Sequence, residues 1–266
     1  MKKRNTRDVV VIALLILAGC SAPQTQKVDT EATMKPELTL QVASLNMSSL
    51  NKRIEKKDIE RFSRMLKKEQ IEVLSVQGIT RYPGVETRVD FVNELIAKSD
   101  LRHAFGEMMN SSGRQTGNGI FSSYPLRNNH NQPFEGVKSA SFEAALQSSV
   151  DGGVKDIVVV STLLPSKASE TEQSACLRMI SKNTDSKEPL IVTGNLPLSE
   201  RVRSIGRYED VSDATGASKT KNLTTHIWYT SDGMLKLIGA RTLETDFGTM
   251  LVAQFGLFRQ VQPANN

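Results

Sequence analysis

The sequence predicts an α/β domain in which two β-sheets pack face to face with helices on the outside. Its 266 residues are 38% hydrophobic, which is enough for one large domain with a sizeable core. The first half alternates strand and helix twice, and the second half consists mainly of strands with one further helix. That order is typical of layered α/β architectures. We find no internal repeat and no second domain boundary.

The first half predicts two strand–helix pairs. Apolar residues alternate at Leu38, Leu40 and Val42, as in a strand, and the charged segment that follows carries apolar residues at helical spacing. A second apolar run and a second amphipathic segment repeat this order. The predicted elements are a strand at Leu38–Asn46, a helix at Ile54–Lys68, a strand at Ile71–Gln77 and a helix at Thr87–Ala97.

The second half predicts short strands separated by turn residues. A loop rich in glycine, serine and asparagine is expected at Asn110–Asn118, and Gly152-Gly153 is expected to join a hairpin. The polar segment Ser199–Asn222 receives no assignment. The predicted strands are Gly119–Ser123, Ser139–Leu146, Asp156–Thr162, Pro189–Thr193, Thr225–Thr230, Leu235–Ala240 and Met250–Phe255, with a helix at Lys167–Lys182.

The N-terminus has the organisation of an export signal. A basic segment precedes the apolar run Val9–Leu17, which is too short for a comfortable membrane span. The run ends in Leu17-Ala18-Gly19-Cys20, which resembles the lipobox of bacterial lipoproteins at all four positions. The resemblance implies cleavage after residue 19, lipidation of Cys20 and a membrane anchor, and Ser21 implies export to the outer membrane. A plain signal peptide with a chance cysteine is the alternative. Residues 20–37 are polar and predict a flexible tether.

Charge and cysteine content narrow the possible partners. The net charge is +5, but without the first nineteen residues the chain holds 30 basic and 28 acidic side chains, which makes nucleic acid an unlikely partner. With Cys20 acylated, Cys176 has no disulfide partner, and its place in a predicted helix favours burial in the core.

One segment carries a family resemblance. Gly117-Asn118-Gly119-Ile120-Phe121-Ser122-Ser123-Tyr124-Pro125-Leu126 resembles the Gly-Asn-Ala-Ile-Leu-Ser-Arg-Tyr-Pro-Ile segment of the endonuclease/exonuclease/phosphatase superfamily. Weaker motifs extend the resemblance over Leu38–Phe255. It implies a four-layer α/β sandwich at residues 38–258, followed by a polar tail at residues 259–266. It also implies Mg²⁺-dependent hydrolysis of phosphodiesters or phosphomonoesters.

The motif positions, however, have mostly lost the residues that this chemistry needs. Asn46 matches the family's asparagine at the end of the first strand, where an asparagine is also a common turn former. The resemblance places other residues at the remaining positions. They are Gly78 for the glutamate that binds the metal, Leu163 for a histidine, Asn195 for an aspartate, His226 for an aspartate, and Phe247 and Gly248 for the closing Asp-His pair. Shifting that last motif by one residue recovers Asp246 as the aspartate but puts Phe247 at the histidine.

These substitutions predict a non-catalytic domain used for binding or scaffolding, without a metal or other cofactor. Its expected partners are the membrane, through the anchor on Cys20, and an envelope protein or ligand. The alternative is an active phosphodiesterase or phosphatase that binds Mg²⁺ through other residues, such as Asp210 or Asp213 with His226. A third reading is a purely structural envelope protein. Gln77 is expected to satisfy nearby backbone groups, and His226 to be packed or hydrogen-bonded.

Overall fold

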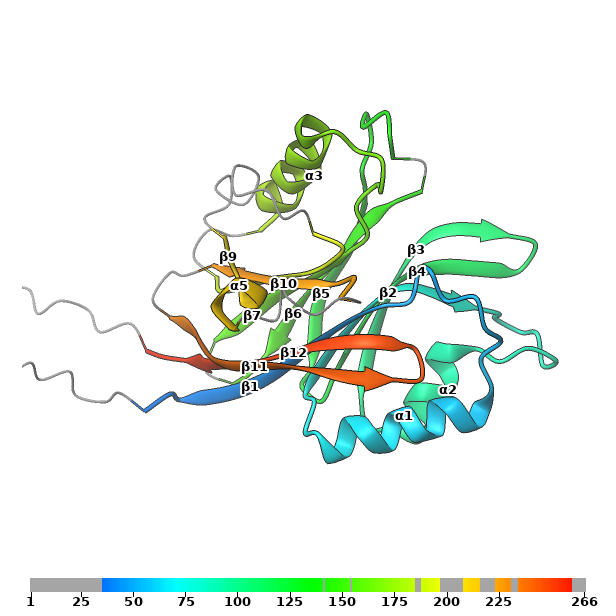
Figure 1. Ribbon diagram of the computed structural model, residues 1–266, viewed down its shortest axis with the longest axis horizontal. Coiled ribbons are helices and arrows are strands. Elements are labelled where there is room, and N and C mark those ends of the chain that lie inside the picture. Colours follow the sequence, from blue (N-terminus) through cyan, green and yellow to red (C-terminus); the bar gives the residue numbers. More distant parts are fainter. Residues whose placement is uncertain are drawn as a thin grey trace, which may run out of the picture. The chain divides into compact units, whose positions relative to one another are not determined.

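The computed structural model describes residues 35–140, 142–153, 155–184, 188–196, 208–215, 223–230 and 234–259. These residues form two mixed β-sheets of six strands each, packed face to face and flanked by helices (Figure 1). The predicted two-sheet sandwich is therefore confirmed. The predicted lipidation site Cys20 and nearly all of the polar tail lie outside the described residues.

The first sheet has the order β11-β12-β1-β2-β4-β3. Its central strands β1 and β2 are parallel, with Asn46 opposite Gln77 at their carboxyl ends, and β12 runs antiparallel to β1. Its strands are β1 (Leu38–Asn46), β2 (Val73–Arg81), β3 (Arg102–Ser111), β4 (Arg114–Ser122), β11 (Leu235–Thr245) and β12 (Gly248–Leu257).

The second sheet has the order β5-β6-β7-β8-β10-β9. Its central strands β7 and β8 are again parallel, with Thr162 opposite Gly194. The predicted hairpin joins β6 to β7 at Gly152-Gly153, where Asp151 pairs with Asp156. Its strands are β5 (Leu126–Pro133), β6 (Ala144–Asp151), β7 (Asp156–Thr162), β8 (Leu190–Gly194), β9 (Tyr208–Asp210) and β10 (His226–Thr230).

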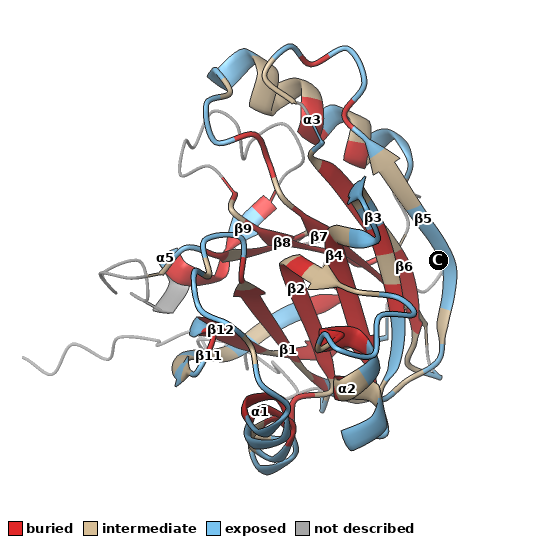
Figure 2. Ribbon diagram, turned by 90° about the vertical axis from the view of Figure 1, so that its right-hand side faces the viewer, coloured by how far each residue is buried: buried red, intermediate tan, exposed pale blue. Residues whose placement is uncertain are grey.

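Helices cover the outer face of each sheet. Helices α1 (Lys56–Lys68) and α2 (Phe91–Lys98) pack on the first sheet, and α3 (Glu170–Lys182) packs on the second with Cys176 buried (Figure 2). A short helix α5 (Val211–Thr215) follows β9. Ser169 and Glu172 form a capping box that fixes the start of α3. No helix in the described ranges is long and apolar enough to cross a bilayer.

Apolar side chains form separate layers inside the sandwich. Leu40 and Val42 of the first sheet pack against Val159 and Ile191 of the second, and two further clusters lie beneath the helices. Figure 2 shows the central strands of both sheets as almost continuously buried. Since alternate residues of each strand face opposite layers, the residues that point toward the other sheet can be read from the pleat.

Several predicted elements differ from the structure. The predicted loop at Asn110–Asn118 is part of the β3–β4 hairpin, which turns at Ser112-Gly113. Its polar side chains reflect exposure on an extended hairpin, not the absence of a strand. The strand expected at Ser139–Leu146 begins only at Ala144 and runs to Asp151. The edge strand β5 was not predicted because most of its residues are exposed and show no alternation. The unassigned segment contains β9 and α5.

An aromatic cluster holds the β11–β12 turn against the helices. The Phe247 ring makes edge-to-face contacts with Phe62 and Phe91, at centroid distances of 5.1 and 5.5 Å. We expect Phe247→Ala to lower the free energy of unfolding by about 3–5 kcal/mol, because it leaves a cavity among these rings. Urea denaturation measures this loss. The control is Phe142→Ala at a side chain that is 58% exposed, and equal losses in the two variants would contradict the prediction.

Candidate functional site

The carboxyl ends of four central strands meet at one rim of the sandwich, which we call the strand-end rim. Asn46 and Gly78 lie there on the first sheet, and Leu163 and Asn195 lie there on the second. The Asn46 side chain donates a hydrogen bond to the Thr224 carbonyl at 3.0 Å, which connects β1 to the segment before β10. Gly78 and Leu163 line the same pocket. The structure therefore brings the sequence-predicted positions of both sheets together.

Beneath the rim, a network of buried hydroxyl groups and one amide joins the two sheets. The Ser44 and Thr225 hydroxyls lie 2.5 Å apart, as do the Ser75 and Thr193 hydroxyls. Each pair has one member on or beside each sheet, and all four residues are fully buried. We call these residues, together with Gln77 and Ser161, the inter-sheet network.

Gln77 is the centre of the inter-sheet network. Its Nε2 donates to Ser75 at 2.9 Å and to Ser161 at 3.2 Å, and its Oε1 accepts from Thr225 at 3.3 Å. The expectation that Gln77 satisfies backbone groups is therefore wrong: its partners are hydroxyls from both sheets. The amide fits here because it supplies donors and an acceptor at once, which a carboxylate cannot do.

The inter-sheet network contains no charged group. Hard divalent cations are bound in proteins by oxygen ligands that include carboxylates. Among the described residues, no group of three histidine, cysteine, aspartate or glutamate side chains could hold a metal ion. The arrangement can lock two sheets together and satisfy buried polar atoms, but it offers no charge to balance a cation.

Both ends of the Asn46 amide are hydrogen-bonded. Its Oδ1 accepts from the Ser48 backbone N–H at 2.9 Å and from the Ser48 hydroxyl at 2.7 Å, and its Nδ2 bonds Thr224. This is the contact pattern of a turn-forming asparagine. The side chain shapes the chain after β1 and connects it to the second sheet.

Gly78 lies where the resemblance implies the metal-binding glutamate, and its backbone is left-handed, with φ of +71°. A Cβ atom added at this position would lie 2.6 Å from the Cα atom of Ser48. Conformation and space therefore both favour glycine. A carboxylate could return to this position only with a shift of the turn after β1.

Asn195 and Leu163 build the second sheet's part of the strand-end rim. The Asn195 Oδ1 accepts from the Leu164 backbone N–H at 2.6 Å, and its Nδ2 donates to the Leu164 carbonyl at 2.8 Å. The amide thus clamps the chain that leaves β7, a two-way bond that an aspartate could not make. Leu163 adds an apolar surface to the adjoining pocket.

His226 lies on the other face of β10 from the inter-sheet network. Its Nδ1 is 3.2 Å from the Ser212 hydroxyl and 3.6 Å from Asp210, so it is hydrogen-bonded as expected. Its neighbour Thr225 is the residue that points between the sheets. The motif comparison therefore missed Thr225, although strand alternation, counted from the buried Ile227, could have found it.

Asp210 is a buried carboxylate whose oxygens already accept several hydrogen bonds. The Trp228 indole donates to it at 3.0 Å and the Ser212 backbone N–H at 2.8 Å. Burial raises its pKa, but hydrogen bonds from His226 and Ser212 outweigh this, so the pKa lies below its usual value. The structure brings Asp210 and His226 together on the outer side of β10, with His226 in register with Gly194 at the rim end of β8.

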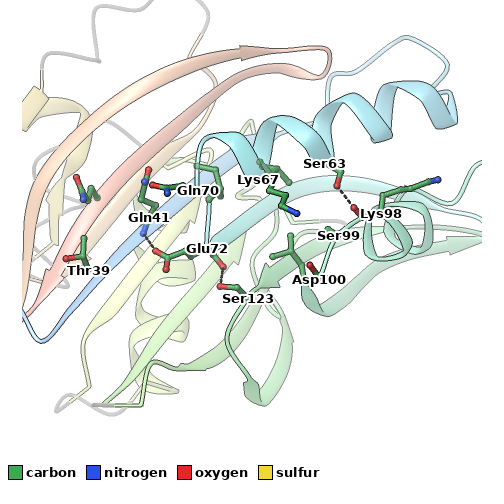
Figure 3. Close-up of a pocket in the computed structure, with 14 residues that line it drawn as sticks. Thr39, Gln41, Ser63, Lys67, Gln70, Glu72, Lys98, Ser99, Asp100 and Ser123 are labelled. Carbon is green, nitrogen blue, oxygen red and sulfur yellow. Dashed lines mark hydrogen bonds between the residues drawn. The ribbon is translucent and has the colours of Figure 1, made fainter.

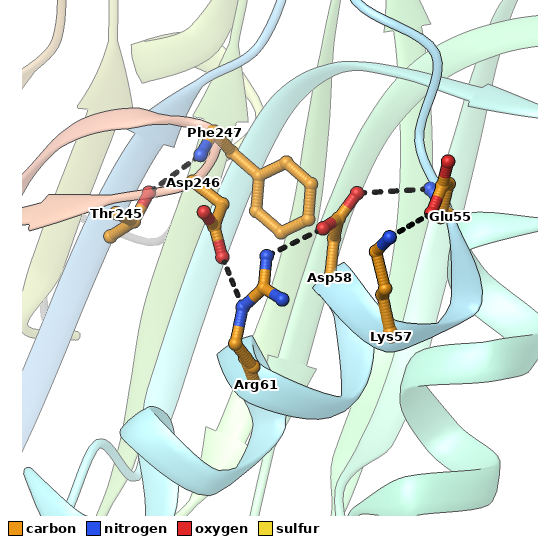
Figure 4. Close-up of polar contacts among 7 residues, drawn as sticks. All are labelled: Glu55, Lys57, Asp58, Arg61, Thr245, Asp246 and Phe247. Carbon is orange, nitrogen blue, oxygen red and sulfur yellow. Dashed lines mark hydrogen bonds and ion pairs between the residues drawn. The ribbon is translucent and has the colours of Figure 1, made fainter.

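The turn before β12 places Asp246 and Phe247 on the α1 side of the first sheet (Figure 4). Arg61 donates to Asp246 at 3.0 Å and to Asp58 at 2.6 Å. The hydrogen bond from Arg61 lowers the pKa of Asp246. Gly248 follows with φ of +123°. Asp246 is thus an ion-pair partner of α1, and Phe247 is a core residue at a position where the resemblance implies a catalytic group.

A pocket of about 500 Å³ lies at the opposite ends of β1 and β2, far from the predicted site residues (Figure 3). Its carboxylate Glu72 accepts from the Gln41 backbone N–H at 2.9 Å and from the Tyr124 hydroxyl at 2.8 Å. Burial, together with Glu72, raises the pKa of Tyr124 to about 12. Glu72 therefore acts as a structural acceptor that ties the start of β2 to β1 and to the segment between β4 and β5.

Comparisons with known proteins identify the fold. No protein-family profile matches the chain, and no curated protein matches it. Solved structures do match. An endonuclease/exonuclease/phosphatase from Beutenbergia cavernae superposes with a TM-score of 0.65 at 16% identity, covering 83% of this chain and 72% of its own. The chain has the endonuclease/exonuclease/phosphatase fold.

Two further structural matches are proteins with individual names. The human Nocturnin catalytic domain with bound sulfate gives a TM-score of 0.62 at 16% identity, over 84% of this chain and 95% of its own. TDP2 of D. rerio, complexed with a single-strand DNA product, gives 0.61 at 14% identity, over 82% and 99%. The segment with the closest sequence resemblance begins in β4 and ends at the first residue of β5. Within it, the buried Asn118 donates to the Ala144 carbonyl at 2.9 Å and joins the two sheets.

The inter-sheet network makes a prediction about pH. In Gln77→Glu a carboxyl replaces a fully buried amide, and burial should raise its pKa above the unfolded value of about 4.3. The unfolded chain then releases the proton first. The variant therefore loses stability, relative to the parent protein, as pH rises above about 4.3, by about 1.4 kcal/mol per unit until the folded pKa is reached.

The matched control is Gln77→Met, which removes the same hydrogen bonds without adding a titratable group. It should cost about 1–3 kcal/mol at every pH. Urea denaturation of both variants between pH 4 and 8 makes the comparison. Parallel pH profiles for the two variants would show that position 77 is open to solvent and would contradict the network.

Proposed function

We propose that this chain is an envelope lipoprotein whose endonuclease/exonuclease/phosphatase-like domain binds a ligand or partner without hydrolysing phosphate esters. The observation that carries the proposal is the uncharged inter-sheet network beneath the strand-end rim. The side chains of the network itself offer only hydroxyl and amide groups. Such a site can recognise a ligand by shape and hydrogen bonding.

Phosphate-ester hydrolysis needs groups that these positions do not supply. Carboxylates would hold the metal, and a paired acid and base would move protons to and from the reacting oxygens. At the matching positions this chain has Gly78, Leu163, Asn195 and Phe247, none of which can donate or accept a proton at neutral pH. Single groups of this kind contribute on the order of 10²–10⁴ in rate, although losses within one unit do not multiply.

A second candidate function is metal-dependent hydrolysis through other residues. The observation that favours it is the contact between His226 and Asp210 at 3.6 Å, which resembles an acid–base pair. Structural neighbours with nuclease or phosphatase names favour it by fold alone. Against it, the His226 side chain lies on the outer face of β10, and Asp210 already accepts hydrogen bonds from Trp228 and Ser212.

A metal titration separates the two functions. A ligand that binds only the folded state adds about 2.7 kcal/mol of stability at a hundred times its dissociation constant. Because the described part of the chain offers no carboxylate cluster, we expect millimolar Mg²⁺ or Mn²⁺ to leave the melting temperature where EDTA leaves it. We also expect no metal-dependent cleavage of phosphodiester or phosphomonoester substrates. A rise in melting temperature together with EDTA-sensitive turnover would establish the second function instead.

The membrane anchor is the other half of the proposal. The lipobox-like Leu17-Ala18-Gly19-Cys20 supports diacylglyceryl transfer to Cys20 and cleavage before it, and Ser21 supports delivery to the outer membrane. Two or three acyl chains anchor a protein stably. Mass spectrometry of the mature protein should find acyl chains on Cys20 and no residue before it. A Cys20→Ala protein that is still processed normally and retained in the membrane would rule the anchor out.

A further inference from the structure

Two pockets adjoin each other at Gly78 on the strand-end rim, and their linings differ in chemistry. Both contain Met47, Leu50, Gly78, Thr80 and Arg114. The first, which we call the basic pocket, has a volume of about 310 Å³, and the second, which we call the apolar pocket, about 260 Å³. Together they are in the size range of small-molecule sites.

Four cationic side chains and no carboxylate line the basic pocket. Lys52 and Arg53 come from the segment before α1, Arg88 from the segment before α2, and Arg114 from the start of β4. In the ranges that the structure describes, none of the four lies within ion-pair distance of an acidic group. Their charge is therefore available to a ligand.

Three acidic residues of the same elements are already paired with other bases. Asp58 bonds Arg61 at 2.6 Å, Glu55 bonds Lys57 at 2.7 Å, and Asp90 bonds Arg81 at 3.4 Å. Aromatic rings hold two of the pocket's cations without neutralising them. Lys52 lies 5.5 Å from the centroid of Phe247, and Arg88 lies 5.7 Å from that of Tyr82.

The apolar pocket adds Met108, Met109, Phe142 and Leu163 to the shared residues. Phe142 is 58% exposed, which is unusual for so large an apolar side chain beside a pocket. The pocket's one carboxylate, Glu143, accepts a hydrogen bond from the Phe142 backbone N–H at 3.1 Å. Methionine side chains adapt to ligands of irregular shape.

We propose that the two pockets together bind an amphiphilic phosphate, with its phosphate groups in the basic pocket and its apolar part in the apolar pocket. This rests on the proposed function, because it names the ligand class of a domain that binds without hydrolysis. Arginine forks match phosphate oxygens, and two phosphate groups carry roughly the charge that three arginines and a lysine balance. Thr80 can donate a further hydrogen bond from the shared wall.

Titration calorimetry with geranyl diphosphate and inorganic pyrophosphate tests the proposal on the purified full chain in EDTA. We expect geranyl diphosphate to bind with a dissociation constant below about 1 mM, and at least about tenfold more tightly than pyrophosphate. Both affinities should fall as salt is added. Equal affinity for the two probes would overturn the role of the apolar pocket.

Variants of each pocket should separate the two parts of the ligand. Arg53→Gln combined with Arg88→Gln should weaken both probes at least about tenfold. Phe142→Ser should weaken geranyl diphosphate alone. The matched control, Lys138→Gln with Arg178→Gln, removes the same charge from exposed sites on the α3 side and should leave both affinities unchanged. All altered side chains are exposed, so every variant should have the melting temperature of the parent protein. If the control weakened both probes as much as the pocket variants do, the proposed site would be overturned.

Further outcomes of these experiments identify other ligands, and they separate failure of the ligand proposal from failure of the proposed function. Tighter binding of a single-stranded oligonucleotide than of geranyl diphosphate would overturn the pocket ligand. Binding to phosphatidylcholine vesicles only when they contain phosphatidic acid would support the ligand class and identify its source as a membrane lipid. If neither probe binds and neither is hydrolysed, the ligand class is overturned, but the proposal of a non-catalytic domain still stands. Binding with EDTA-sensitive release of phosphate in a parallel assay with Mg²⁺ would leave the pocket standing and overturn the non-catalytic function.

Discussion

The inter-sheet network is the interaction on which the architecture of the site depends. Apolar contacts hold most of the two sheets together, but beneath the strand-end rim the sheets are joined by hydrogen bonds. These come from hydroxyl pairs 2.5 Å apart and from the Gln77 amide. Buried polar groups stabilise a structure only when their partners are all in place, and a group left without one costs free energy. Gln77 meets this requirement because its amide bonds hydroxyls of both sheets, so the network fixes their spacing and the positions of Asn46, Gly78 and Asn195 above it.

The same network explains how the two sheets pack beneath this rim without a buried carboxylate. Burying carboxylates without a cation would raise their pKa values and lower stability. Neutral side chains at Asn195 and Gln77 avoid that cost, and Asn195 uses both ends of its amide on Leu164. Gly78 fits a left-handed turn that leaves no space for a side chain. Gln77, Gly78 and Asn195 therefore each have a structural role at the strand-end rim.

The sequence predicted the parts of this fold that have strong periodicity. Strands β1, β7, β8 and β10 and helices α1, α2 and α3 are found near their expected positions, because each buries one clear apolar face. Strand β3, the first half of β4 and the edge strand β5 were missed, since exposed strands carry polar residues on both faces and resemble loops. The site could be located from motif order, but its contacts could not. Gln77 binds hydroxyls that come from strands distant in the sequence, and Thr225, not His226, faces them, which only the pleat of the folded strand determines.

Loss of the acidic groups and gain of an anion site can be one and the same change. Carboxylates at the rim would attract a metal ion and neutralise neighbouring cations. With glycine at position 78 and asparagine at position 195, neither position supplies a carboxylate to Lys52, Arg53, Arg88 and Arg114, and within the described part of the chain none of these four forms an ion pair. A phosphate ligand could then bind these cations directly, without a metal between them. The charge balance thus links the neutral network to the basic pocket: under the proposed function, a site without hydrolytic groups retains the charge needed to hold a phosphate ester.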